Sequence, residues 1–203
     1  MLTLALETST TACGVALGGP ELTAIVLEDT RTRRHAEVLT PLVRDACRQA
    51  GVGLAELDRI VVDLGPGGFT GLRVGLASAR ALGWASGTPV LGLTSLELLR
   101  EPCDTTFVSV LDAGTGLFWA AWGARPLEPA WGRADELVAL LAGTPCVLGG
   151  TGAGELAEAL GGTARVAHER EPSAAMLLER ADDAVEAREL HYLRPHYAAK
   201  KTK

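Results

Sequence analysis

Seven residues, Gly65 to Gly71 with the sequence GPGGFTG, restrict the fold of this chain more than any other stretch. An apolar run at 60–64 precedes them, and an almost uncharged stretch with helical spacing follows from Thr70 to Gly87. A strand, a glycine-rich turn and a helix in that order can turn backbone N–H groups toward an anion. Thr70 is the expected N-cap. Because no Gly-Lys-Ser/Thr follows, this is not a Walker A loop, and it is either a phosphate turn or a structural tight turn.

Composition limits the classes of protein that fit. The chain has 203 residues, of which 47% are hydrophobic and 22% are charged, as in an ordinary globular protein. No apolar run reaches membrane-spanning length, and the first residues lack the basic region of a signal peptide, so a cytoplasmic location is expected. The four cysteines form no CxxC pair, which predicts free thiols and no zinc site. The net charge of −6 argues against an autonomous nucleic-acid binder.

The first half of the chain reads as alternating strands and helices. Three short strands joined by tight turns predict an antiparallel meander, at 2–6, 12–17 and 22–27. Residues 35–50 have helical spacing, and Pro41 either starts that helix, with Thr40 as its cap, or kinks it. Further strands are expected at 60–64 and 89–93, and Thr94 to Glu97 resembles a capping box.

The predicted helix at 70–87 has almost no polar face. Arg73 and Arg80 are its charged residues, and small residues repeat every four positions, at Gly71, Gly75, Ala79 and Gly83. A helix that is apolar nearly all round is buried on more than one side. The small-residue stripe therefore either seats the helix on its own sheet or meets another protein.

The second half begins as the first did, which suggests two similar lobes. A hinge is expected at 102–105, dividing the chain into lobes 1–102 and 103–203. A hairpin is expected at 106–111 and 117–122. Helices are predicted at 134–141, 155–160 and 173–188, with Ser173 as the last cap, and a second possible phosphate turn lies at 149–154.

Two basic segments have open interpretations. Arg31, Arg33, Arg34 and His35 form the first, and the tail with Lys200, Lys201 and Lys203 forms the second. Each is either a solvated segment or a contact with an acidic partner or an RNA backbone.

With these elements placed, the chain resembles the bacterial TsaB (YeaZ) family, the non-catalytic paralogue of TsaD in tRNA threonylcarbamoyladenosine modification. The GPGGFTGLRVG run at 65–75 is the most specific match. Weaker matches follow in the expected order, namely LALETST at 4–10, His35-Ala36-Glu37, Leu39 to Pro41, Pro89 to Ser95, Leu111-Asp112-Ala113 and Tyr192-Leu193-Arg194.

The resemblance implies an α/β protein with a two-lobed actin/Hsp70/sugar-kinase-like (ASKHA) fold, each lobe being ribonuclease-H-like. It implies a heterodimer with TsaD, a link to TsaE through the complex, a homodimer when the protein is alone, and only indirect contact with tRNA. The helices at 35–50 and 70–87 would form the partner interface. The candidate residues there are Val38, Leu42, Arg73, Leu76, Ala79, Arg80 and Gly83.

The same resemblance points to a vestigial nucleotide site, with ATP or ADP as the candidate cofactor. Its candidate residues are Glu7, Thr8, Ser9, Gly65, Gly67, Gly68 and Asp112. Three positions depart from the family pattern: Glu7 stands where Asp is usual, Gly68 where Ser is usual, and Gly114 where Arg is usual. The paired histidines spaced HxxxH that hold a metal in TsaD-like proteins are missing after residue 93, so neither a metal site nor a catalytic residue is expected.

Two functions from different classes follow. The first is a non-catalytic subunit that binds and stabilises TsaD for modification of adenosine 37 in tRNA. The alternative is an ATP-binding or phosphotransfer enzyme of the ASKHA fold, which would use Glu7, Asp63 and Asp112. ATP turnover by the isolated chain distinguishes the second from the first.

Overall fold

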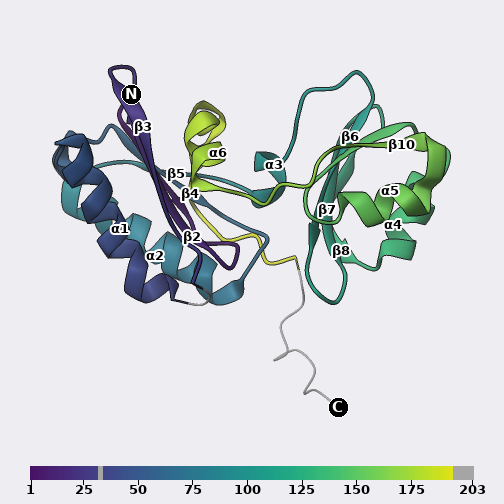
Figure 1. Cartoon of the computed structure of the whole chain (residues 1–203), viewed down its shortest axis with the longest axis horizontal. Coiled ribbons are helices and arrows are strands. Elements are labelled where there is room, and N and C mark those ends of the chain that lie inside the picture. The colour runs from purple at the N-terminus through teal and green to yellow at the C-terminus, as the bar shows by residue number, and fades with distance from the viewer. Residues whose placement is uncertain (32–33, 194–203) are drawn as a thin grey trace, which may run out of the picture. The chain divides into compact units, whose positions relative to one another are not determined.

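The computed structural model describes residues 1–31 and 34–193, and it divides into two compact units (Figure 1). The first comprises Met1–Leu98 with Pro172–His191, and the second comprises Leu99–Glu171 with Tyr192 and Leu193 among the described residues. The division expected at residue 102 assigned 172–191 to the second lobe. That assignment needs correction, because helix α6 (Ala174–Glu179) packs on the sheet of the first unit.

The first unit contains a mixed sheet in the order β11-β5-β4-β1-β2-β3. Its antiparallel meander confirms the expectation, with β1 at Thr3–Glu7, β2 at Cys13–Gly19 and β3 at Leu22–Asp29. Strand β4 (Arg59–Asp63) runs parallel to β1, and β5 (Val90–Leu93) runs parallel to β4. The carboxyl ends of β1 and β4 therefore lie side by side, and the loops that follow them are neighbours.

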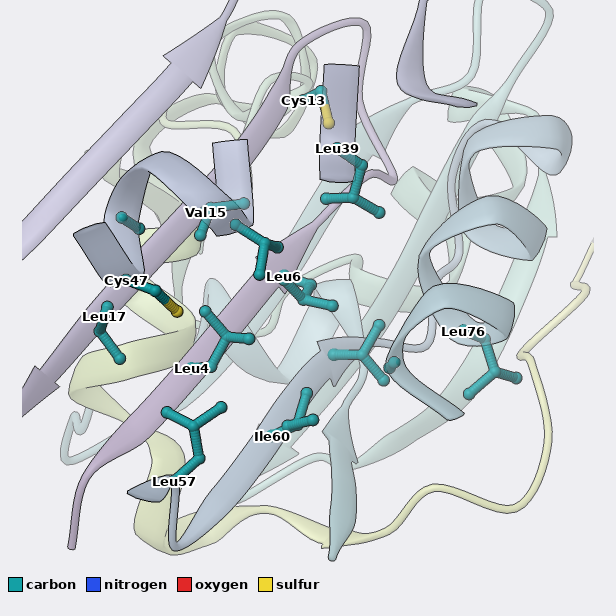
Figure 2. Close-up of a cluster of buried hydrophobic side chains, with 14 of the residues drawn as sticks. Leu4, Leu6, Cys13, Val15, Leu17, Leu39, Cys47, Leu57, Ile60 and Leu76 are labelled. Carbon is teal, nitrogen blue, oxygen red and sulfur yellow. The ribbon is translucent and has the colours of Figure 1, made fainter. Parts of the chain in front are cut away.

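Helices cover both faces of this sheet because its strands carry apolar residues on both sides. Helices α1 (His35–Ala50) and α2 (Phe69–Ser86) cover one face, and α6 covers the other (Figure 1). Figure 2 shows the larger cluster, in which Leu4 and Leu6 of β1 lie with Leu39 of α1. The opposite face is lined by small residues such as Ala5 and Ala16, against which α6 packs closely.

Both long helices end at a glycine with positive φ, as the sequence predicts. Gly51 (φ 70°) ends α1 and Gly87 (φ 74°) ends α2 in the left-handed conformation that favours glycine. Pro41 lies inside α1, so the alternative that this helix begins there is wrong. Helix α2 begins one residue earlier than expected. Its N-cap is Gly68, whose carbonyl accepts the first helical bond from Leu72, and not Thr70.

The second unit repeats the strand order of the first. Three antiparallel strands, β6 (Thr106–Asp112), β7 (Leu117–Gly123) and β8 (Leu127–Gly132), are followed by two parallel strands on the other side of β6. These are β9 (Cys146–Gly149) and β10 (Ala164–His168), and the sheet order is β10-β9-β6-β7-β8. Helices α4 (Ala134–Leu141) and α5 (Ala153–Leu160) bury their apolar sides against it. The repeat confirms the expected α/β class and the likeness of the two halves.

The predicted helix at 173–188 is three separate elements. Ser173 caps α6 as expected, its hydroxyl oxygen accepting from Met176 N at 3.3 Å. The chain then forms a short 3-10 turn at Ala181–Asp183 and strand β11 (Val185–Glu186), which pairs with the open edge of β5. Strand pairing at this edge determines the structure in spite of the helical propensity of the segment. The sequence pattern alone could not reveal this pairing.

The remaining elements are short. They are α3 (Ser95–Leu98) and 3-10 turns at Leu54–Glu56 and Gly161–Thr163. Thr94 and Glu97 form the expected capping box at α3, with Glu97 Oε2 accepting from Thr94 N at 2.8 Å. Within the ranges given above, no helix combines the length and the hydropathy needed to cross a bilayer.

Candidate functional site

The glycine loop lies directly against the turn between β1 and β2. A Cβ atom at Gly67 would stand 2.5 Å from the Ser9 carbonyl oxygen, and one at Gly75 would stand 2.2 Å from Thr8 Oγ1. Gly68 N donates to the same Ser9 oxygen at 2.6 Å. Only residues without a side chain permit this approach, so close packing of two backbone segments accounts for the glycines.

This packing occupies backbone N–H groups and side chains that would be needed to bind a phosphate. Thr8 and Ser9 are buried beneath the loop, and the backbone N–H groups of Ser9 and Gly65 donate to carboxylates of the protein. The structure thus brings together six residues of the predicted nucleotide site, Glu7, Thr8, Ser9, Gly65, Gly67 and Gly68. Nucleotide binding itself stays a prediction. The geometry supplies a structural reason for the glycine sequence that needs no ligand.

Two carboxyl groups lie side by side beneath this loop. The register that pairs Leu6 with Val62 places Glu7, the last residue of β1, beside Asp63, the last residue of β4. Both are buried. Ser95 Oγ donates to the two carboxylate oxygens of Asp63 at 2.8 and 2.9 Å, and Gly65 N donates to Asp63 Oδ1 at 2.6 Å. Glu7 Oε1 accepts from Ser9 N at 2.5 Å.

The environment raises the pKa of both carboxyl groups above the usual range. For Glu7, burial is the largest cause and the nearby charge of Asp63 is the second. For Asp63, burial raises the pKa, while hydrogen bonds from Glu7, Gly65 and Ser95 oppose the increase. Asp63 was expected to matter only in the enzyme alternative. Its position at a strand end was visible in the sequence, and the parallel register of β1 and β4 places it beside Glu7.

Asp112, the remaining predicted nucleotide-site residue, belongs to the second unit. It is exposed, its backbone N donates to Thr151 Oγ1 at 2.9 Å, and its Oδ1 accepts from Gly114 N at 2.7 Å. The glycine turn at 149–154 precedes α5, where the N–H of Gly154 donates to Glu169 Oε1 at 3.0 Å. A carboxylate of the protein thus already sits at this second candidate phosphate turn.

His35 is part of the interior, although the sequence placed it in a basic patch. Its Nε2 lies 3.1 Å from the Thr10 carbonyl and 3.0 Å from the Ala12 carbonyl, so this nitrogen carries the proton and donates. Helix α1 is thereby tied to the β1–β2 turn. The neighbouring charges are balanced, because Arg31 pairs with Asp29 and Arg34 pairs with Glu37. Arg33 and the lysine tail lie outside the described residues.

Most of the predicted partner residues face their own unit. The side chains of Val38, Leu76 and Ala79 are buried in its core. Gly83 is buried too, and a Cβ there would stand 2.7 Å from the Thr88 carbonyl oxygen. Leu42 is half-buried against the same core. The small-residue stripe therefore seats α2 on its own unit, and its assignment to a partner contact needs correction.

The two arginines of α2 are exposed but differ in role. Arg80 Nη2 donates to the carbonyls of Ala187 at 3.2 Å and Arg188 at 2.5 Å, which holds the returning C-terminal segment. The Arg73 guanidinium lies 3.8 Å from the centroid of the Phe69 ring. Both side chains lie on the outer, exposed side of the helix.

That outer face carries two exposed aromatic residues that the sequence reasoning missed. Trp84 is 89% exposed and Phe69 is 37% exposed. They share the face with Arg73, Ala77 and Ala81, opposite the buried glycines. We name Phe69, Arg73, Ala77, Ala81 and Trp84 the outer face of α2. The missed signal is their spacing, which follows the helix period on the side away from the small-residue stripe.

No group of three or more His, Cys, Asp or Glu side chains within residues 1–31 and 34–193 could hold a metal ion. All four cysteines are free.

Comparison with known proteins agrees with this architecture. The sequence model of the family of tRNA N6-adenosine threonylcarbamoyltransferases (TsaD) matches residues 26–138. An uncharacterized protein of Mycobacterium tuberculosis is 43% identical over 108 residues, 52% of this chain and 51% of that protein. The tRNA threonylcarbamoyladenosine biosynthesis protein TsaB of Escherichia coli is 30% identical over 128 residues, 60% of this chain and 55% of its own. The chain spans about half the length of the curated relatives that it matches.

Solved structures match nearly the whole chain. Two YeaZ-type structures from Pseudomonas aeruginosa cover 95% of this chain and 99% of theirs, with TM-scores of 0.77 and identities of 30% and 29%. A ROK hexokinase from Thermus thermophilus, at 17% identity and a TM-score of 0.50, shares the fold alone, which is the two-lobed ASKHA type. Because the family match covers more than half of the chain and the YeaZ match covers almost all of it, the chain belongs to the TsaB (YeaZ) family, within the wider family that the TsaD model describes.

Proposed function

We propose that this protein is a non-catalytic subunit that binds and stabilises a TsaD-type enzyme during formation of N6-threonylcarbamoyladenosine at position 37 of tRNA. The observation that carries the proposal is the outer face of α2. A tryptophan that is 89% exposed, beside a partly exposed phenylalanine, is unfavourable in water and is typical of a surface that another protein covers.

The composition of this face fits a protein partner. It combines two aromatic side chains and one arginine, which are residue types enriched at interfaces, with two small alanines, and it bears no carboxylate. Arg73 over the Phe69 ring gives the face a rigid element that loses little entropy on binding. The names of the relatives, TsaB and TsaD, supply the identity of the partner.

Further parts of the proposal rest on the resemblance to the TsaB family. Alone, the protein would form a homodimer through the outer face of α2, and TsaD would replace the second copy. TsaE would join through the complex, tRNA would be contacted mainly by the other subunits, and the setting would be the cytosol. The chemistry would lie in TsaD, and the hydrogen bonds and close packing of the glycine loop within its own unit support this division of labour.

The proposal is tested by titrating TsaD from the same organism with Trp84→Glu and with Leu140→Glu. Leu140, on α4, is also an exposed apolar helix residue, at 42%, and serves as the matched control. We expect Trp84→Glu to weaken binding at least about tenfold while Leu140→Glu binds as the wild type does, because hot-spot aromatics cost about 2 kcal/mol or more when lost. Equal affinities for both variants would remove this face from the interface.

A further inference from the structure

The ends of β1 and β4 carry two adjacent buried carboxyl groups, to which the residues that the structure describes offer no positively charged partner. Glu7 and Asp63 lie side by side at 2% and 0% exposure. Within the described part of the chain, no arginine, lysine or histidine forms an ion pair with either group. Two adjacent carboxylates ionised together, away from water and without a cation, repel each other strongly.

The donors around the pair identify which oxygen is left over. Asp63 Oδ1 accepts from Gly65 N and Ser95 Oγ, and Asp63 Oδ2 accepts from Ser95 Oγ. Glu7 Oε1 accepts from Ser9 N. Glu7 Oε2 is buried and has no donor among the described residues, although the two carboxyl groups are close enough for a hydrogen bond. Two unprotonated acceptors cannot form that bond, but a carboxylic acid and a carboxylate can.

We propose that Glu7 keeps a proton at neutral pH and donates it from Oε2 to Asp63, so that one proton clamps the end of β1 to the end of β4. The negative charge is better stabilised on Asp63, because Asp63 accepts from two donors of the surrounding protein, Gly65 N–H and the Ser95 hydroxyl, whose single hydrogen lies between the two carboxylate oxygens. Burial followed by the Asp63 charge raises the pKa of Glu7, which agrees with this assignment. The two groups titrate as a pair that holds one proton between them.

The proton shared by Glu7 and Asp63 affects the segments that these two side chains hold in place. Through Ser9 N, Glu7 holds the β1–β2 turn, and through Gly65 N and Ser95 Oγ, Asp63 holds the glycine loop and the start of α3. Loss of the proton would place two negative charges between the segments that meet at Gly68 N and Ser9 O. The other titratable group facing the pair is Cys13 on β2, whose pKa burial and the charge of Glu7 raise to about 12.

The clamp is therefore a pH-sensitive device in the first unit. The folded state holds the proton more tightly than the unfolded chain, in which a glutamate has its ordinary pKa of 4.5. Stability is fully present below that value and is lost as the pH rises toward the raised pKa of the folded state. In that window the ratio of folded to unfolded protein falls about tenfold for each pH unit. This inference does not depend on the proposed function.

The test is urea unfolding of the full chain over a range from acidic to mildly alkaline pH, for the wild type and for Glu7→Gln. A glutamine amide keeps a donor toward Asp63 but cannot ionise. We expect the folded-to-unfolded ratio of the wild type, relative to Glu7→Gln, to fall about tenfold per pH unit above the ordinary glutamate pKa. Glu28→Gln, at an exposed position on β3, is the control and should follow the wild type.

Two further measurements keep the proposal falsifiable. If Glu7→Gln does not fold, Asp63→Asn should reduce the pH dependence, because the asparagine removes the charge that is the second cause, after burial, of the raised pKa of Glu7. Infrared spectroscopy of the wild type should show a protonated carboxyl group at neutral pH that Glu7→Gln lacks. Parallel pH profiles for all variants would overturn the proposal. So would a wild type that Mg²⁺ stabilises and EDTA destabilises, since a cation would then occupy the place of the proton.

Discussion

A Cβ atom at Gly71 would stand 2.0 Å from the carbonyl oxygen of Thr8, so the first turn of α2 and the β1–β2 turn meet backbone to backbone. Gly67 meets the Ser9 backbone in the same way, and a Cβ atom at Gly75 would meet the Thr8 side chain. The glycine-rich sequence therefore fixes the position of α2 on the sheet. The outer face of α2 is directed to solvent because the opposite face, with its glycines and with Leu76 and Ala79, is buried against the first unit.

The first prediction concerns that contact. Gly71→Ala should destabilise the first unit by about 2–3 kcal/mol, because backbone atoms on both sides must move to admit a methyl group. Chemical unfolding followed by far-UV circular dichroism measures the change. Gly162→Ala is the matched control, since nothing lies within 4 Å of a Cβ at that position. Equal midpoints for the two variants would show that the contact is not tight.

The second prediction concerns His35. His35→Ala should cost about 1–3 kcal/mol of stability, because the carbonyls of Thr10 and Ala12 lose the donor that they share in the interior. His35→Gln places an amide donor near the same oxygens and should recover part of the loss. Thermal unfolding of the three proteins checks this. If His35→Gln is no more stable than His35→Ala, then packing of the ring, and not its hydrogen bonds, is what matters.

The third prediction separates the two arginines of α2. Arg80→Met should increase amide hydrogen exchange in residues 185–191, because it removes the donor to the carbonyls of Ala187 and Arg188. Arg73→Met changes the same residue type on the same helix without touching that segment. Exchange measured by mass spectrometry should therefore rise in the first variant and stay at the wild-type level in the second. A rise in both would mean that α2 itself is loosened.

The sequence predicts much of this fold because the local sequence patterns favour the same strands and helices that the folded sheet contains. The helix at 35–50 has the bounds expected, and the three-stranded meander follows from short apolar runs separated by tight turns. The prediction of one helix at 173–188 was wrong, because the backbone at 185–186 pairs with the edge of β5 in spite of its helical composition. Edge pairing depends on a strand nearly a hundred residues away, which no local pattern encodes.

The candidate site, like the fold, was predictable from the sequence only in part. Glu7 and the glycine loop were expected to lie together because the family resemblance places both in one nucleotide site. That the strand ends converge became evident only from the parallel pairing of β1 and β4. The orientation of the small-residue stripe was not predictable, since Ala79 and Gly83 fit closely against either a partner or their own sheet. The exposed position of Trp84 became evident only when the buried side of α2 was known.

The central claim is that this protein binds TsaD through the outer face of α2. The most direct measurement is light scattering of this chain mixed with TsaD from the same organism, after size-exclusion chromatography. We expect a one-to-one complex that forms at the expense of any homodimer and that Trp84→Glu abolishes or weakens. A chain that stays unbound at micromolar concentration, and that hydrolyses ATP by itself, would contradict it.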